Sequence, residues 1–188
     1  MPQKNFKIKE LKSDRLILRK FTKEDFDFIK THFTSENVNQ YLYDNEPPSS
    51  DKDVQGILDW VMDFSSGDHM RWGIVLKDQP EILVGTCGFH GYDQNNNAAE
   101  IGYDLSSKHH RKGYMSEALR AIIKYGFGEL HLHKISAAVY IGNTASNKLL
   151  EKLGFKLEGV IRDKHFFRGE YFDHNLYSLL ETEKENNI

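Results

Sequence analysis

The sequence is poor in cysteine, and Cys87 is the only one among 188 residues. A single thiol excludes an intrachain disulfide and is typical of proteins from a reducing compartment. Cys87 stands in an apolar stretch with no obvious activating partner. We therefore expect a small buried side chain rather than a nucleophile.

Long apolar runs and an excess of one charge are also missing. No stretch approaches the roughly 18 apolar residues of a membrane helix, and the charged start MPQKNFKIKELKSDR lacks the apolar core of a signal peptide. The net charge of −3 gives no general polycation to hold nucleic acid. We expect a soluble cytoplasmic protein without membrane or nucleic-acid partners. It should form a single domain over residues 1–188, with its core at about 13–180.

Common nucleotide and metal signatures are absent as well. There is no GxxxxGK followed by Ser or Thr, and GTCGFHG at 85–91 lacks the GxGxxG spacing. NTP and NAD are therefore poor candidates. The histidine pairs 131/133 and 109/110 have no convincing further ligands nearby, so we expect no metal.

What the sequence does contain is an alternation of strand and helix patterns. Strands are predicted at 15–21, 71–77, 82–93, 98–106, 134–141, 156–166 and 171–181. Helices are predicted at 23–34, 114–129 and 143–155. A further helix is predicted to follow the polar loop 41–53, which ends at a serine cap. The order βααβββαβαββ predicts an α/β fold with a mixed sheet, in which a central antiparallel meander precedes a parallel section.

The segment HHRKGYMSEAL, residues 109–119, places a cationic loop and a glycine at a predicted helix start. Backbone N–H groups there have no intrahelical partners, and Gly113 permits close approach and unusual dihedral angles. A phosphate or pyrophosphate suits such a site, and Lys108, Arg111 and Lys112 would add charge. A solvated basic loop with a glycine turn is the alternative.

The ensemble AEIGYDL, HHRKGYMSEAL and NTASNKLLEKLGFKLEG resembles the GNAT superfamily of acyl-CoA-dependent N-acyltransferases. SDRLILRKFTKEDF and RGEYFDHNLYSLL extend the resemblance over about 13–180, toward the ribosomal-protein N-terminal acetyltransferases (RimJ/RimL-like). This resemblance implies a GNAT-like, mixed but mostly antiparallel central sheet flanked by helices. Acetyl-CoA would be the co-substrate, and a homodimer is possible.

The same resemblance assigns a cofactor site. The family pattern Gln/Arg-x-x-Gly-x-Gly/Ala departs here at its first and last positions, which are histidine and methionine. The backbone amides of this loop would hold the pyrophosphate of coenzyme A. Its pantetheine arm would follow the strand that ends at Leu105 and pass Asn143. The loop residues are His110, Arg111, Lys112, Gly113, Tyr114, Met115 and Ser116.

The resemblance also suggests catalytic residues for transfer of an acetyl group from a thioester to an amine. Glu100 in AEIGYDL is the candidate general base, and an exposed strand glutamate is the alternative. Ser146 is the candidate proton donor to the departing thiolate, and helix capping is the alternative. Many acetyltransferases use a late-helix tyrosine for this role, but the matching residue is Leu150. An N–H donor near Leu105 would stabilise the thioester oxygen.

The acceptor is predicted to be the α-amine of a protein or peptide N-terminus. Polyamines, aminoglycosides and other small amines are rivals, and a non-catalytic acyl-CoA sensor is the alternative of another class. The family places two regions at the acceptor mouth, where acidic side chains would attract a cationic amine. These regions contain Tyr41, Tyr43, Asp44, Glu46, Phe166, Phe167, Glu170, Tyr171 and Phe172.

Overall fold

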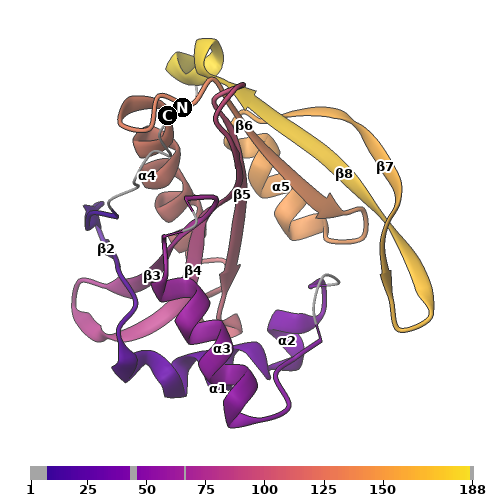
Figure 1. Cartoon of the computed structure of the whole chain (residues 1–188). Helices are drawn as coiled ribbons and strands as arrows, with labels where there is room; N and C mark the ends of the chain where they lie inside the picture. The colour runs from indigo at the N-terminus through magenta and orange to yellow at the C-terminus, as the bar shows by residue number, and fades with distance from the viewer. Residues whose placement is uncertain (1–7, 43–45, 66, 187–188) are drawn as a thin grey trace.

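An eight-stranded sheet in the order β1-β2-β3-β4-β5-β6-β8-β7 forms the centre of the molecule (Figure 1). The computed structural model describes residues 8–42, 46–65 and 67–186. The strands are β1 Leu11–Lys12, β2 Leu16–Arg19, β3 Met70–Leu76, β4 Gln79–Asp93, β5 Ala98–Leu105, β6 Lys134–Tyr140, β7 Lys156–Phe167 and β8 Glu170–Leu180. The α-helices are α1 Phe26–Phe33, α2 Glu36–Asn39, α3 Asp51–Met62, α4 Tyr114–Gly128 and α5 Thr144–Lys152.

The sheet is antiparallel except between β5 and β6. These two strands pair only where Ala98–Glu100 meets Lys134–Ser136, and they then diverge, as Figure 1 shows. The predicted antiparallel meander and parallel section are both confirmed. The divergence opens the middle of the sheet beside the second half of β5.

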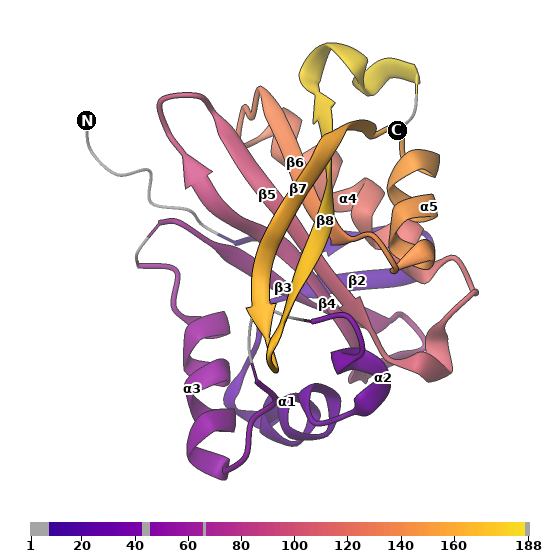
Figure 2. The same cartoon turned by 90° about the vertical axis from the view of Figure 1, so that its right-hand side faces the viewer.

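Helices cover both faces of the sheet. Figures 1 and 2 show α1 and α3 together, apart from α4 and α5. The two faces follow from strand alternation in β3: Trp72 and Ile74 pack in the core with α4 and α5, while Val75 packs with α1 and α3. Cys87 lies fully buried in the α4 side of the core, as expected, and burial raises its pKa.

Several predicted boundaries were wrong. The short edge strand β1 and the four-residue helix α2 were not predicted, because two to four residues carry too little periodicity. Helix α3 begins directly after the Ser50 cap, so it includes the last residues of the predicted loop. The strand predicted at 82–93 begins three residues earlier, because Gln79 pairs with Leu76 across a two-residue turn. Tyr43 and Asp44 lie outside the described residues.

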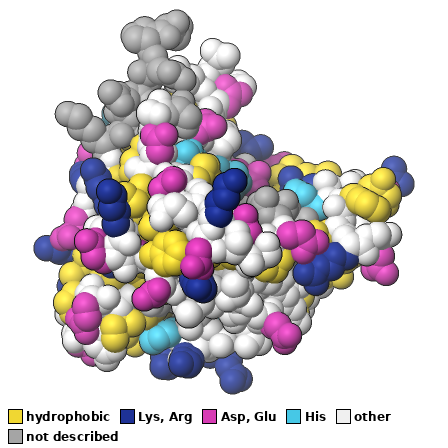
Figure 3. Space-filling model, turned by 60° about the horizontal axis from the view of Figure 1, so that its bottom comes forward, with side chains coloured by type: hydrophobic (Ala, Val, Ile, Leu, Met, Phe, Trp, Pro, Cys, Tyr) yellow, Lys and Arg dark blue, Asp and Glu magenta, His cyan; other side chains and the backbone are white. Residues whose placement is uncertain are grey.

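The β7–β8 hairpin extends from the body of the molecule at the right of Figure 1. Its turn, Arg168–Gly169, has φ angles of 51° and 89°, and positive φ at both central residues is typical of a two-residue type I′ turn. Acidic and basic side chains are mixed over the face seen in Figure 3, without a patch of one sign. Among the described residues, no helix is both long and apolar enough to cross a membrane.

Candidate active site

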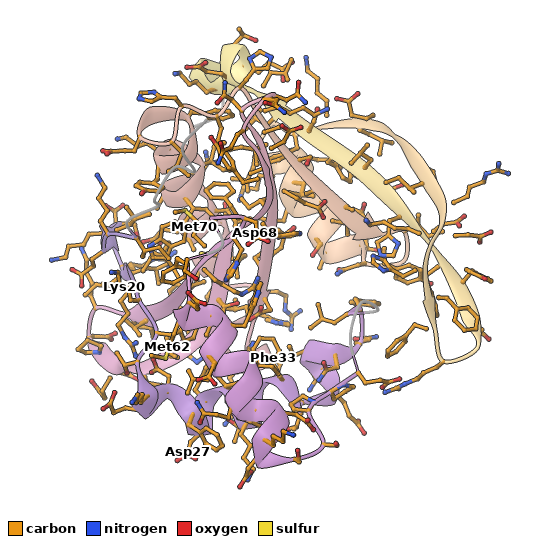
Figure 4. The ribbon with its side chains drawn as sticks, viewed as in Figure 1. Lys20, Asp27, Phe33, Met62, Asp68 and Met70 are labelled. Atoms are coloured by element: carbon orange, nitrogen blue, oxygen red, sulfur yellow. The ribbon has the colours of Figure 1, made fainter. Side chains whose placement is uncertain are left out.

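A cavity of about 1060 Å³ lies where β5 and β6 diverge. Its wall includes Phe33 at the end of α1 (Figure 4) and side chains from the segment before α3, from α3, β5, β6, the start of α5, and β7 and β8. The cavity brings together Glu100, Asn143 and Ser146, all predicted from the sequence. Leu105 and the loop 110–116 are not part of this wall and lie beyond it, at the end of β5.

Glu100 faces His90 across the β4–β5 ladder. The two residues are direct register partners, and His90 Nε2 lies 3.5 Å from Glu100 Oε1. Burial by itself raises the pKa of Glu100, but His90, Lys164 and the Ala138 backbone N–H together lower it below its ordinary value. Glu100 is therefore an ionised carboxylate at neutral pH, open to the cavity. His90 and Lys164 also line the cavity, and sequence reasoning missed both.

A buried charge cluster lies beside this pair on the same face of the sheet. Asp104 accepts from Arg71 and from the Thr86 hydroxyl at 2.6 Å, and it lies 2.6 Å from His32 Nε2. Burial raises the pKa of Asp104, but the Arg71 charge, His32 and Thr86 outweigh it and lower the pKa to about 2. Gly102 leaves room for the cluster, since a Cβ there would lie 3.4 Å from Arg71 Nη1. The charge of Arg71 is thus already paired where it reaches the cavity.

The start of α5 supplies the opposite wall. Asn143 caps this helix by accepting from the Ser146 backbone N–H at 3.1 Å. The cap is therefore complete without the Ser146 side chain, whose residue lines the cavity. Leu150 is fully buried in the core, so the helix presents no other candidate proton donor from that position.

The divergence of β5 and β6 frees one edge of β5. Ser106 N–H donates to Val84 O at 2.8 Å, so even-numbered residues of β5 direct their N–H and C=O groups to β4. The backbone groups of Ile101, Tyr103 and Leu105 consequently point to the side from which β6 has diverged. An extended ligand lying there can hydrogen-bond with them as a missing strand would.

The loop after β5 ends in an open helix start. Gly113 is the N-cap of α4 in the left-handed conformation, with φ 81°, and it provides no side-chain cap. Helices α3 and α5, by contrast, are capped by Ser50 and Asn143. The first-turn N–H groups of α4 therefore face outward without a protein cap, in the arrangement that suits an anion. Arg111 also has a positive φ, 59°, and is exposed with Lys112.

Two positions that depart from the family pattern have clear locations. His110 Nε2 lies 2.9 Å from Leu105 O, which connects the loop to the end of β5. Met115 is 8 % exposed and packs in the core, so its side chain points away from the loop surface. Tyr114 and Ser116 are half-buried in the first turn.

Arg15 braces this loop, and sequence reasoning did not identify it. Its guanidinium donates to Lys112 O at 3.0 Å and to Glu117 Oε2 at 2.8 Å. The same guanidinium lies 4.6 Å from the centre of the Tyr114 ring. Only the fold brings residue 15 to this helix start, so no local sequence signal was available.

The two regions predicted to form the acceptor mouth meet at the cavity. Arg168 at the hairpin tip pairs with Glu46 before α3 at 3.0 Å, and Glu46 lines the cavity with Tyr41. The Phe166 and Tyr171 rings contact each other at a tilt of 51°, with ring centres 4.8 Å apart, and both are exposed outside the cavity wall. The described residues contain no group of three or more His, Cys, Asp or Glu placed to hold a metal ion.

Comparisons with known proteins agree with this arrangement. Residues 15–156 match the Acetyltransferase (GNAT) domain model. The chain is 37 % identical to the uncharacterized N-acetyltransferase YoaA of Bacillus subtilis, over 91 % of this chain and 96 % of that protein. It is 30 % identical to the [ribosomal protein uS5]-alanine N-acetyltransferase of Escherichia coli, over 90 % and 89 %.

A solved structure shares the fold. The spermidine N-acetyltransferase from Vibrio cholerae, in complex with CoA and spermine, matches with a TM-score of 0.80 at 23 % identity, over 91 % of this chain and 98 % of that one. The domain match covers most of the chain, and the full-length relatives are N-acetyltransferases. The chain therefore belongs to the GNAT acetyltransferase family and is an acetyltransferase enzyme.

Proposed function

We propose that this enzyme transfers the acetyl group of acetyl-CoA to the α-amine of a protein or peptide N-terminus, as a member of the ribosomal-protein N-terminal acetyltransferase branch. One observation carries the proposal: β5 connects the cavity carboxylate Glu100 to the free edge at Leu105 and the uncapped start of α4. The relative that acts on ribosomal protein uS5 supports the choice of acceptor.

In this proposal the loop 110–116 binds the pyrophosphate through its backbone amides, and the pantetheine arm follows the free edge of β5 past Asn143. The neutral amine attacks the thioester carbon, and the Leu105 N–H stabilises the negative charge on the carbonyl oxygen. Glu100 accepts the amine proton through water. The C–S bond then breaks, and the Ser146 hydroxyl donates to the departing thiolate.

The acceptor class follows from the weakness of this base. Reference pKa values are 7.7–8.0 for an α-amine and about 10.4 for lysine. At pH 7.5 roughly a third of an α-amine is neutral, against about one lysine in a thousand. Glu100, whose pKa is lowered, is suited to an amine that is already largely deprotonated.

Release of coenzyme A from acetyl-CoA tests the proposal with matched acceptors. These are a peptide with a free N-terminal alanine, the same peptide N-terminally blocked but carrying one lysine, and spermidine. The free peptide should have the highest kcat/KM. A higher value for the blocked peptide or for spermidine would show that the acceptor is a side-chain or small amine. Glu100→Gln and Ser146→Ala should lower kcat without changing the Kd of coenzyme A.

A further inference from the structure

The Tyr103 hydroxyl is a buried polar group without a hydrogen bond. Its Oη is shielded from solvent and has no hydrogen-bond partner among residues 8–42, 46–65 and 67–186. The ring packs against the core and forms part of the cavity wall. A phenylalanine would pack equally well and would avoid the cost of a buried unsatisfied hydroxyl. The hydroxyl therefore calls for a functional explanation.

Ser146 is the polar neighbour of this hydroxyl. Burial raises the pKa of Tyr103 to about 12, although the nearby Ser146 side chain lowers it in part. The phenol thus stays protonated at neutral pH and acts as a donor. Complete transfer of its proton to a thiolate, whose reference pKa is about 8.5, would be uphill by more than three pH units. Tyr103 is accordingly suited to orient a group rather than to supply a proton.

The hydroxyl of Ser146 needs such an orienting partner. A serine hydroxyl has one hydrogen to donate and can accept two hydrogen bonds. The Asn143 cap engages only the backbone N–H of Ser146 and leaves the side chain free to rotate. A hydrogen bond from Tyr103 to Ser146 Oγ would occupy one acceptor position and would leave the serine hydrogen to point into the cavity.

We propose that Tyr103 is a positioning residue that holds the Ser146 hydroxyl, from behind the cavity wall, in the orientation that donates to the departing sulfur. This inference rests on the proposed role of Ser146. In the step itself, the C–S bond breaks, its electron pair goes to sulfur, and the Ser146 hydrogen bond stabilises the thiolate. The thiolate then takes up the proton that Glu100 accepted from the amine, relayed through solvent, while Tyr103 and Ser146 keep theirs.

A double-mutant cycle tests this coupling, because a residue that acts only through Ser146 has no effect once that hydroxyl is gone. Tyr103→Phe and Ser146→Ala should each lower kcat about tenfold, and the double variant should be no slower than Ser146→Ala. The KM for acetyl-CoA should not change. The melting temperature of Tyr103→Phe should equal or exceed that of the wild type, since a buried unsatisfied hydroxyl is removed.

Coenzyme A bound without acceptor gives a readout independent of turnover. A hydrogen-bond donor to the thiolate lowers the pKa of the bound coenzyme A thiol. Both single variants should therefore raise this pKa, which is measured by the ultraviolet absorption of the thiolate as the pH is varied. Tyr125→Phe is the matched control, because this core tyrosine on α4 does not line the cavity; its kcat should match the wild type.

The outcomes separate the two proposals. Full kcat in Ser146→Ala overturns the role of Ser146 and the inference with it. If Ser146→Ala lowers kcat but Tyr103→Phe has the kcat of the wild type, the role of Ser146 stands and only the inference about Tyr103 is overturned. The inference is also overturned if the kcat of the double variant is lowered by the product of the two single effects, because the two residues then act independently.

Discussion

Arg15 Nη2 lies 2.7 Å from Glu117 Oε2, across more than one hundred residues of sequence. The same carboxylate accepts from the Arg15 backbone N–H at 2.7 Å and from the Ser13 hydroxyl at 2.7 Å. Because Arg15 also donates to Lys112 O, the end of the loop and the first turn of α4 are held by one side chain. The brace fixes the directions of the N–H groups proposed to bind pyrophosphate.

Arg15→Ala should therefore weaken coenzyme A binding about tenfold, or about 1.4 kcal/mol, with kcat at saturating acetyl-CoA unchanged. Calorimetric titration with coenzyme A measures the Kd. Lys9→Ala is the matched control. It removes a different ion pair, Lys9–Glu129 at 2.6 Å, which lies at the C-terminal end of α4 and away from the loop. An unchanged Kd in Arg15→Ala would show that the brace does not shape the site.

Gly113→Ala should lower both stability and coenzyme A affinity. The left-handed backbone costs a non-glycine residue about 1–2 kcal/mol, and the new Cβ would lie 3.3 Å from Arg15 Nη2. Gly169→Ala imposes similar strain at φ 89° with no atom near the Cβ. Both variants should melt at lower temperature, but only Gly113→Ala should raise the Kd. Equal Kd values of the two variants for coenzyme A would show that Gly113 is not needed for coenzyme A binding.

The Glu100–His90 pair predicts the pH dependence. Because the pKa of Glu100 is lowered, its carboxylate is ionised throughout the neutral range, and wild-type kcat/KM should rise there only with deprotonation of the α-amine near 7.7–8.0. Glu100→Gln should lower the rate about 100-fold at pH 7, and less at pH 9, where the amine is already neutral. His90→Ala removes an influence that lowers the Glu100 pKa, so burial raises it. The fall of kcat/KM at low pH should then become steeper in this variant, because Glu100 is protonated there as well as the amine; an unchanged slope would contradict the role of His90.

Asp104 should govern acid stability. A carboxyl with a folded pKa of about 2 stabilises the fold above its unfolded pKa near 3.9, by roughly 2–3 kcal/mol, and loses this as the pH falls toward 2. Asp104→Asn leaves the Arg71 charge without its carboxylate and should cost about 3–5 kcal/mol at pH 7. Urea unfolding at several pH values should also show that the free energy of unfolding of Asp104→Asn changes less between pH 4 and 2 than that of the wild type. If the stability of Asp104→Asn depended on pH as strongly as that of the wild type, another group would be responsible for the acid sensitivity.

The sequence by itself determined the elements and the local devices. Helical spacing located α4 and α5, the Asn143 cap and the left-handed Gly113 followed from residue type, and the strand–helix alternation predicted the parallel section. Each of these depends on interactions within a few residues, which the local sequence specifies.

Only the tertiary structure decided which side chains meet. Counting back from the pairing Asp93–Ala98 would place His90 opposite Ile101, but an irregularity between His90 and Asp93 shifts the register by one residue and puts His90 opposite Glu100. Such a shift exchanges the two faces of a strand, and nothing in the local residue pattern fixes where it occurs. The Arg15–Glu117 brace and the proposed Tyr103–Ser146 pair likewise join distant segments, because packing of whole elements, not local propensity, sets their distance.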